Sequence, residues 1–267
     1  MRYRGGILIM NLLSVNGVTL YEGPSRITGE PIALIATGLA TPTANPKTPH
    51  CVTVWGISAD IPPSMHIKSG ARSTCGDCPI LEQCYVGGYA LASVYRAYKS
   101  GKYPRLGLER LPELMRRGYK LRLGGYGNPS IVGWRQFGAI IPKLGLSWLS
   151  YEHDWKNCPA SWRRVSMAST ENVSGTLAAH SRGWRAYQVA PVNEGPAMVH
   201  RLKSHGLRAV LCPYDKDDRS SITCHSCPHP CDGKISDKDR RPHIVAEIHG
   251  SPSIVNKRNQ ALRVLQG

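Results

Sequence analysis

Seven of the nine cysteines in this 267-residue chain fall into two short groups, and any fold has to bring the thiols of each group together. The first group lies on one loop and consists of Cys75, Cys78 and Cys84. The second group lies near the end of the chain and consists of Cys212, Cys224, Cys227 and Cys231. Clustered cysteines without an export signal are typical of metal sites rather than disulfides. We therefore expect each group to bind a metal.

The beginning of the chain makes a poor export signal. Residues 1–10 contain basic residues and a short apolar run, but polar residues resume at Asn11 and no small-residue cleavage site follows. No later stretch reaches the roughly 18 apolar residues that a membrane span requires. We expect a protein of the reducing cytoplasm with no membrane partner.

Strand-like and helix-like segments alternate from residue 51 onward. The expected strands cover residues 52–57, 120–129 with a glycine-rich turn, 146–151, 164–169, 184–190, 207–213 and 243–249. The expected helices cover residues 88–99, 130–141 with Ser130 as N-cap, 172–181 and 197–205. Such alternation predicts parallel strands joined by right-handed crossovers.

The predicted fold class is therefore α/β, with a partial or complete (βα) barrel. Residues 51–267 would form this domain, including the second cysteine segment at 212–231, and residues 1–50 would be an irregular, β-containing lead-in packed on it. In such a barrel the chemistry lies on the loops at the carboxyl ends of the strands. We expect both cysteine groups on that same face.

The first cysteine group lacks a fourth local ligand. Cys51 precedes it in the chain, but it begins the preceding strand and is expected at the opposite end of the barrel. Structural zinc sites usually take four ligands, whereas an iron–sulfur cluster is held by thiolates. The group therefore predicts a [4Fe–4S] cluster with one open iron.

The second cysteine group supplies a complete set of four thiolates, with eleven, two and three residues between them. This set suits a second [4Fe–4S] cluster, while the flanking His225 and His229 favour zinc. Both alternatives stay open. The isolated Cys51 and Cys158 are expected to be ordinary buried thiols.

The chain resembles an uncharacterised phage-encoded protein family that is itself similar to radical S-adenosylmethionine barrel enzymes. The resemblance rests on the first cysteine loop with Tyr85, the segments at 95–99, 101–104 and 122–129, and Cys212 with the last cysteines. It implies one or two [4Fe–4S] clusters, S-adenosylmethionine as cofactor, a flavodoxin or ferredoxin as electron donor, and the cytoplasm of an infected host cell. The common radical pattern has three and then two residues between its cysteines, whereas this chain has two and then five.

Several other residues are candidates for the site. Tyr85 borders the third cysteine, and Gly124, Gly125 and Tyr126 end the second strand, where the resemblance implies contact with the amino group of the cofactor. Ser166 and Ser169 are expected to face the same side of their strand, with Ser169 binding the cofactor. Arg185 is expected to bind the polar end of a cofactor or substrate, with a surface ion pair as the alternative. The catalytic candidates are His153, between Glu152 and Asp154, and Glu194; a structural histidine and a surface ion pair are the respective alternatives.

The formal net charge of +16 favours a polyanionic partner such as DNA, RNA or a nucleotide. Basic residues interleaved with tyrosines are concentrated between Arg96 and Arg122, which fits either a phosphate-binding surface or a solvated helix face. No nucleophile elbow, phosphate-binding loop or zinc-protease helix motif occurs, so hydrolase and nucleoside-triphosphatase activities are disfavoured.

These observations support one main hypothesis and two alternatives. The main hypothesis is an iron–sulfur enzyme that cleaves S-adenosylmethionine reductively and acts on a nucleic acid or nucleotide. The first alternative is a non-catalytic nucleic-acid-binding protein stabilised by zinc. The second is an iron–sulfur protein that serves only in redox transfer or sensing.

Overall fold

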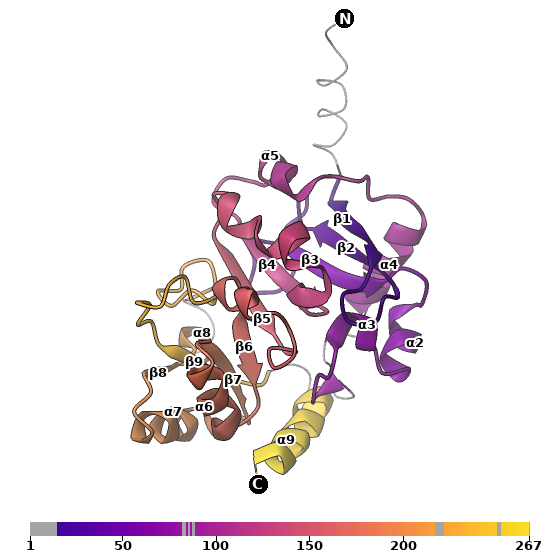
Figure 1. Cartoon of the computed structure of the whole chain (residues 1–267). Helices are drawn as coiled ribbons and strands as arrows, with labels where there is room; N and C mark the ends of the chain where they lie inside the picture. Colours follow the sequence, from indigo (N-terminus) through magenta and orange to yellow (C-terminus); the bar gives the residue numbers. More distant parts are fainter. Residues whose placement is uncertain are drawn as a thin grey trace, which may run out of the picture.

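One sheet organises the chain in the computed structural model, which describes residues 15–81, 84, 86, 89–216, 222–249 and 252–266 (Figure 1). Nine strands in the described residues pair in the order β1-β2-β3-β4-β5-β6-β7-β9-β8. They are β1 (Gly17–Pro24), β2 (Pro31–Thr37), β3 (Cys51–Ser58), β4 (Lys120–Tyr126), β5 (Trp148–Glu152), β6 (Met167–Thr170), β7 (Ala186–Ala190), β8 (Ala209–Leu211) and β9 (His243–Glu247).

The direction of the strands changes once along the sheet. β1, β2 and β3 pair antiparallel, whereas every pair from β3 to β8 is parallel. Among the described residues β1 and β8 do not pair with each other, so the sheet is open. The α/β class with parallel strands is therefore confirmed, but the strands do not close into a complete barrel.

The helices lie around this sheet and are mostly short. They are α2 (Pro63–Lys68), α3 (Arg72–Cys75), α4 (Tyr89–Lys99), α5 (Leu111–Leu114), α6 (Val173–Ser181), α7 (Gly195–Ser204), α8 (Pro213–Lys216) and α9 (Pro252–Gln266). α6 starts at the predicted place, where the Oδ1 atom of Asn172 accepts a hydrogen bond from the Gly175 amide at 2.7 Å. None of the helices in the described part of the chain has both the length and the apolar character needed to cross a membrane.

The helix predicted over residues 130–141 is wrong. Short 3₁₀ turns at Pro129–Ile131 and Ile141–Lys143 flank a single π turn at Trp134–Gly138. The backbone is extended at Val132, between the turn at Pro129–Ile131 and the π turn. Pro142 has no amide hydrogen with which to continue a helix. Ser130 is fully buried and caps nothing; its amide instead donates to the Glu152 carboxylate.

The two faces of the parallel sheet have different neighbours because side chains alternate along each strand. On one face, α7 packs on β8 and β9 through Met198, Leu202, Ala209 and Val245. The other face, which we call the inner face, carries Tyr151, Tyr187 and Ile244, and it borders two cavities. Each cavity contains one of the two cysteine groups.

Candidate metal centres

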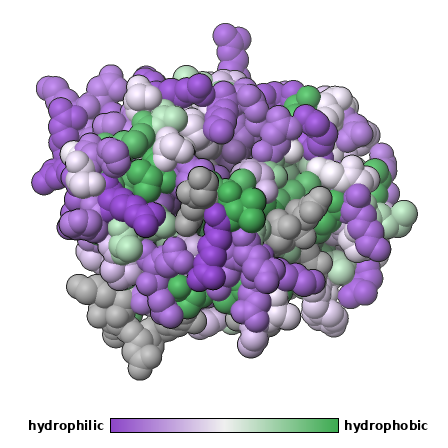
Figure 2. Space-filling view, turned by 90° about the horizontal axis from the view of Figure 1, so that it is seen from below, coloured by the Kyte–Doolittle hydropathy of each residue, from purple (hydrophilic) through white to green (hydrophobic). Residues whose placement is uncertain are grey.

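The first cavity lies at the carboxyl ends of the parallel strands and contains the first cysteine group. It encloses about 940 Å³ of space between the atoms, part of it open to solvent. Its walls include Cys75, Cys78, Cys84, Gly124, Gly125, Tyr126, Asn128, Tyr151, His153, Ser169, Tyr187, Val189, Glu247 and Arg258. Figure 2 shows the molecule from the side on which α9 lies in Figure 1. Hydrophobic residues gather near the middle of this face, and hydrophilic residues surround them.

Asn128 ties the cysteine loop to the strand ends. Its side-chain amide donates to the Cys75 carbonyl at 2.8 Å, and its Oδ1 atom accepts from the His153 amide at 3.0 Å. Its own amide donates to the Thr74 carbonyl at 2.7 Å. Asn128 is only 2% exposed, so all three bonds are shielded from water. The sequence reasoning missed this residue, because the need for an amide there arises only when three separate segments meet.

Glycines at the end of β4 allow the backbone to come close to its neighbours. A Cβ atom on Gly125 would lie 2.3 Å from the Thr53 side chain. Gly127 has a φ of +75°, and a Cβ atom there would lie 2.8 Å from the Gly56 carbonyl oxygen. The predicted glycine-rich segment, from Gly124 to Gly127, lines the same cavity as the first cysteine group.

Two thiols of the first group, those of Cys75 and Cys78, are protonated at neutral pH in the absence of a metal ion. Burial raises the pKa of Cys75 to about 12 and that of Cys78 to about 11. A bound metal would replace these protons. Three thiols, which are the donors that an iron–sulfur cluster requires, line one cavity. No three His, Cys, Asp or Glu side chains among the described residues converge on one metal position, so the cluster stays a prediction. All nine cysteines are described, and none forms a disulfide.

His153 lines the cavity as predicted, and a carboxylate lies behind it. Its Nδ1 atom is 4.0 Å from the Oε1 atom of Glu171. Burial lowers the pKa of His153 and raises the pKa of Glu171. A neutral imidazole at neutral pH can accept a proton from a bound molecule. Glu152, in contrast, is completely buried, and its carboxylate accepts hydrogen bonds from the amides of Ser130 and Asp154.

The prediction that Ser166 and Ser169 face the same side is wrong. Ser169 lines the first cavity, whereas the Ser166 hydroxyl lies 2.6 Å from that of Ser150, away from the cavity. Residues three apart on an extended chain point to opposite sides, which is the physical reason.

Two other predicted residues, Arg185 and Glu194, lie outside the first cavity. Arg185 precedes β7 and is hydrogen-bonded to the segment that carries the second cysteine group. Glu194 precedes α7 and forms an ion pair of 3.3 Å with Arg263 of α9. Tyr85 is not among the residues that the structure describes.

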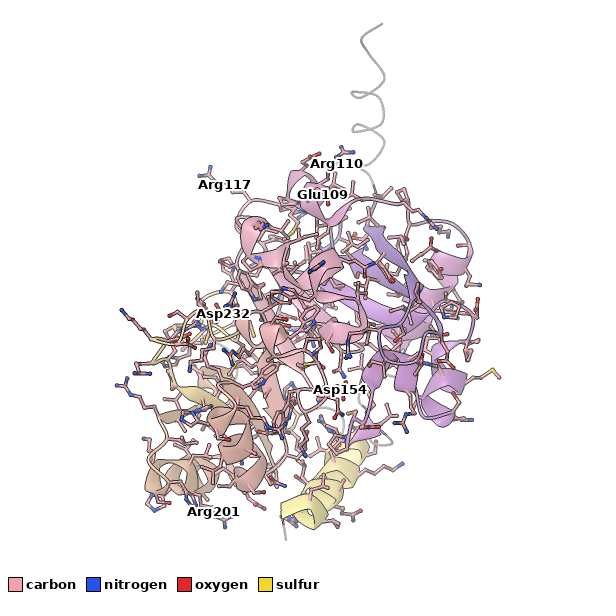
Figure 3. The ribbon with its side chains drawn as sticks, in the orientation of Figure 1. Glu109, Arg110, Arg117, Asp154, Arg201 and Asp232 are labelled. Atoms are coloured by element: carbon pink, nitrogen blue, oxygen red, sulfur yellow. The ribbon has the colours of Figure 1, made fainter. Side chains whose placement is uncertain are left out.

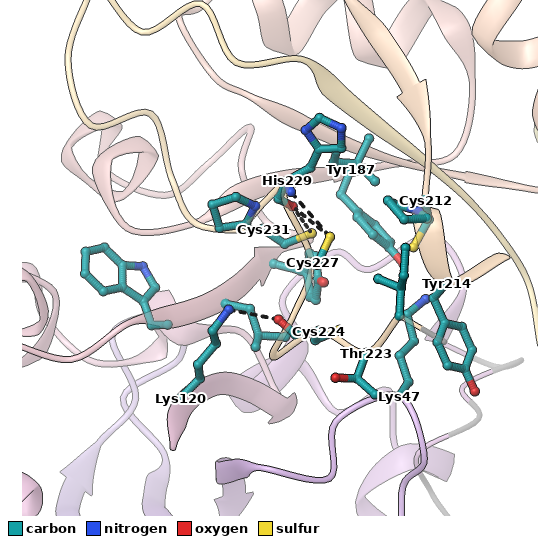
Figure 4. Close-up of a pocket in the computed structure, with 17 residues that line it drawn as sticks. Lys47, Lys120, Tyr187, Cys212, Tyr214, Thr223, Cys224, Cys227, His229 and Cys231 are labelled. Carbon is teal, nitrogen blue, oxygen red and sulfur yellow. Dashed lines mark hydrogen bonds between the residues drawn. The ribbon is translucent and has the colours of Figure 1, made fainter. Parts of the chain in front are cut away.

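The second cavity contains all four cysteines of the second group (Figure 4). It encloses about 480 Å³ of space, part of it open to solvent, and its walls also include Lys47, Lys120, Trp148, Tyr151, Tyr187, Tyr214, His229 and Ile244. Cys212 directly follows β8. The segment with the other three cysteines is fixed by backbone bonds from the Cys224 amide to the Lys47 carbonyl at 2.9 Å and from the Ser150 amide to the Cys231 carbonyl at 2.9 Å.

Four thiols line one cavity, which is the number of donors that a tetrahedral metal or a cluster takes, although no three of these described thiols converge on one metal position. Burial raises the pKa of Cys231 to about 12 and also raises the pKa values of Cys212 and Cys224. The Cys227 sulfur already accepts a hydrogen bond from the His229 amide at 3.4 Å. Cys51 and Cys158 are buried and line neither cavity.

The two cavities share two aromatic walls. Tyr151 and Tyr187 line both, and their ring centroids are 4.3 Å apart. The second cavity reaches Lys120 and Trp148, the first residues of β4 and β5, and so extends toward the amino ends of the strands. Both cysteine groups thus lie on the inner face of the sheet. The first group lies at the carboxyl ends of the strands, and the cavity of the second group extends toward their amino ends. The sequence reasoning placed both at the carboxyl ends.

The basic residues between Arg96 and Arg122 do not form a single surface. Arg105 pairs with Glu22 and Arg110 with Glu113, and Arg110 and Arg117 project from the end of the molecule that holds α5 (Figure 3). Another group lies beside the second cysteine segment, and we call it the His50 patch. It consists of His50, Arg116, Tyr119 and His225, and the exposed Arg117 adjoins it in the chain.

Ring contacts hold the His50 patch together. The His50 ring lies 5.5 Å from the Tyr119 ring and 5.3 Å from the His225 ring, and the Arg116 guanidinium lies 5.9 Å from the centroid of Tyr119. His50 and His225 are exposed. The patch therefore presents cations and aromatic faces to solvent.

No protein family profile, curated protein or solved structure matches this chain. Its chemistry is therefore inferred from the site alone.

Proposed function

We propose that the chain is an iron–sulfur enzyme of the radical S-adenosylmethionine type, built on a partial (βα) barrel. One observation supports this most. Three cysteines of one loop and the glycine-rich end of β4 line the same cavity at the carboxyl ends of parallel strands. That end is where barrel enzymes carry their reactive groups.

Each part of the first cavity has a role in this proposal. Cys75, Cys78 and Cys84 would hold a [4Fe–4S] cluster. Such a cluster, reduced by a flavodoxin or ferredoxin, would supply the electron for reductive cleavage of S-adenosylmethionine. The backbone at Gly124–Tyr126 binds the polar end of the cofactor, with Ser169 as a further hydrogen-bonding group. His153 accepts or returns a proton, and the wall shared by Tyr151 and Tyr187 separates the substrate from the second cysteine group.

The test is metal and product analysis on protein purified without oxygen. About eight irons with matching sulfide are expected, as two four-iron clusters require, and reduction with S-adenosylmethionine present should produce 5′-deoxyadenosine. Zinc without iron would overturn the proposal and favour a zinc-stabilised binder of nucleic acid. Iron–sulfur clusters without cleavage would also overturn it and favour a redox or sensing protein.

For the substrate we propose a nucleic acid or a nucleotide. The His50 patch borders the second cavity, because the Lys120 side chain beside it donates to the Cys224 carbonyl at 2.9 Å. Guanidinium groups bind phosphates, and aromatic rings stack on bases. The patch combines both kinds of contact beside the second cavity.

Replacing Arg116 and Arg117 with alanine is expected to weaken binding of a single-stranded oligonucleotide. Two lost phosphate contacts should reduce the slope of log affinity against log salt by about 1.4. Fluorescence anisotropy across a salt series measures this slope. The matched control is Arg201→Ala with Lys203→Ala, which removes the same charge from the exposed side of α7. Equal losses for both double variants would show that the net charge, not the His50 patch, binds the oligonucleotide.

A further inference from the structure

A buried lysine borders the second cysteine group. Lys47 is only 8% exposed, and its ammonium lines the second cavity with the four cysteines (Figure 4). Within the described part of the chain, Nζ is buried and makes no hydrogen bond. Its contacts are an ion pair with the Oδ1 atom of Asp215 at 3.6 Å and the Tyr214 ring, whose centroid lies 5.0 Å away.

Asp215 compensates this charge only in part. A distance of 3.6 Å is too long for a strong charge-assisted hydrogen bond. The other oxygen of Asp215 accepts a hydrogen bond from the Glu247 amide at 3.1 Å, which directs the carboxylate partly toward β9. A buried ammonium without full compensation is unfavourable, so the site is suited to a further negative charge.

The second cavity offers one source for that charge. None of its described wall residues is Asp or Glu, and its wall carries a second cation, Lys120. The wall also carries tyrosines, but burial raises the pKa values of Tyr151 and Tyr187 well above their ordinary value, so the four cysteine thiols, which lose their protons when they bind a metal, are the main source of negative charge there. A zinc ion or a doubly positive four-iron cluster bound by four thiolates has a net charge of minus two, which would complement the ammonium.

Backbone hydrogen bonds connect both Lys47 and Asp215 to the cysteine segments. The Cys224 amide donates to the Lys47 carbonyl at 2.9 Å, and the Asp215 amide donates to the Cys212 carbonyl at 2.9 Å. The ion pair therefore joins the two chain segments that carry the cysteines. Its charges are placed by the same segments that would bind the metal.

We propose that Lys47 is the built-in counter-cation of an anionic metal–tetrathiolate group at Cys212, Cys224, Cys227 and Cys231, and that Asp215 positions Lys47 and moderates its charge. The inference rests on the metal-binding part of the proposed function. It applies equally to iron–sulfur and to zinc, since both groups are anionic.

Three variants of the full chain test the inference: Lys47→Met removes the charge, Lys47→Arg keeps it, and Asp215→Asn removes the opposing charge. If the site holds an iron–sulfur cluster, its reduction potential is measured by titration in a chain that lacks the first three cysteines. Removing a nearby positive charge disfavours the more negative, reduced state. Lys47→Met should shift the reduction equilibrium about tenfold toward oxidation, which is about 59 mV for one electron. Asp215→Asn should shift it the other way, and Lys47→Arg should stay near the parent.

If the site holds zinc, competition with a chelator gives the equivalent measurement. Lys47→Met should weaken zinc binding on the order of tenfold, as loss of one nearby unit charge implies, and Asp215→Asn should strengthen it. Thermal unfolding of each variant shows whether the fold is retained. If Lys47→Met does not fold, Asp215→Asn decides alone.

Two results would overturn the inference. One is a Lys47→Met variant that folds and matches the parent in potential or zinc affinity. The other is an Asp215→Asn variant that leaves the measured value unchanged or moves it in the same direction as Lys47→Met, because the pair would then be structural. Failure of the proposed function gives a different result. The parent protein would then form no 5′-deoxyadenosine, while Lys47→Met and Asp215→Asn would still shift the potential or the zinc affinity in opposite directions.

Discussion

Replacing Cys75, Cys78 and Cys84 together with alanine is expected to remove about half of the bound iron and to abolish formation of 5′-deoxyadenosine. The three thiols line one cavity and form the donor set proposed for the first cluster. The four cysteines of the second group line a separate cavity, so their iron should stay bound. Iron and sulfide analysis, electron paramagnetic resonance and product chromatography measure the three effects.

The fold should tolerate this triple change. Cys78 and Cys84 are half-buried, and Cys75 loses only its sulfur on a loop that Asn128 continues to hold through the backbone carbonyl of residue 75. Cys158→Ala is the matched control, because it removes a buried thiol from the main hydrophobic core and from neither cavity. The control should keep all of its iron and activity. A triple variant that retained the parent's iron content would show that these thiols bind no cluster.

The second large effect is expected from Arg185→Met, which should lower the free energy of unfolding by about 3–5 kcal/mol. Arg185 is 3% exposed. Its guanidinium donates to the carbonyls of Pro230, Asp232 and Pro242 at 3.0–3.1 Å and to the Asp232 carboxylate at 3.1 Å. Removing it leaves the carbonyl acceptors of Pro230, Asp232 and Pro242 without this donor, and the Asp232 carboxylate keeps only part of its charge compensation, from Arg241. Urea denaturation at neutral pH measures the loss.

The same change should also weaken metal binding at the second site. Pro230 and Asp232 flank Cys231, so Arg185 fixes the backbone on both sides of a proposed ligand. Arg241→Met is the control: Arg241 pairs with the same Asp232, but its side chain is 27% exposed. A loss of about 1 kcal/mol or less is expected there. Equal destabilisation by the two variants would contradict the special role of the buried guanidinium.

Arg185 also illustrates why single residues are hard to interpret from a sequence. Its place beside a strand predicted contact with the polar end of a cofactor or substrate. In the structure its guanidinium instead binds carbonyl groups 45 to 57 positions later in the chain. No local pattern reveals such a contact, because a carbonyl group is present at every position. The same limitation concealed Lys47, whose sequence neighbours are ordinary turn residues.

The sequence by itself determined where several strands and helices lie and that seven cysteines form two groups. Hydrophobic periodicity, glycine positions and cysteine spacing are local properties, so β3, β4, β7, α6 and α7 lie close to where they were predicted. The tertiary structure decided which segments meet: the open sheet, the shared wall of Tyr151 and Tyr187, the anchoring by Asn128, and the burial of Lys47 beside four thiols. Burial and charge compensation depend on neighbours far away in the chain, and only the folded arrangement specifies those neighbours.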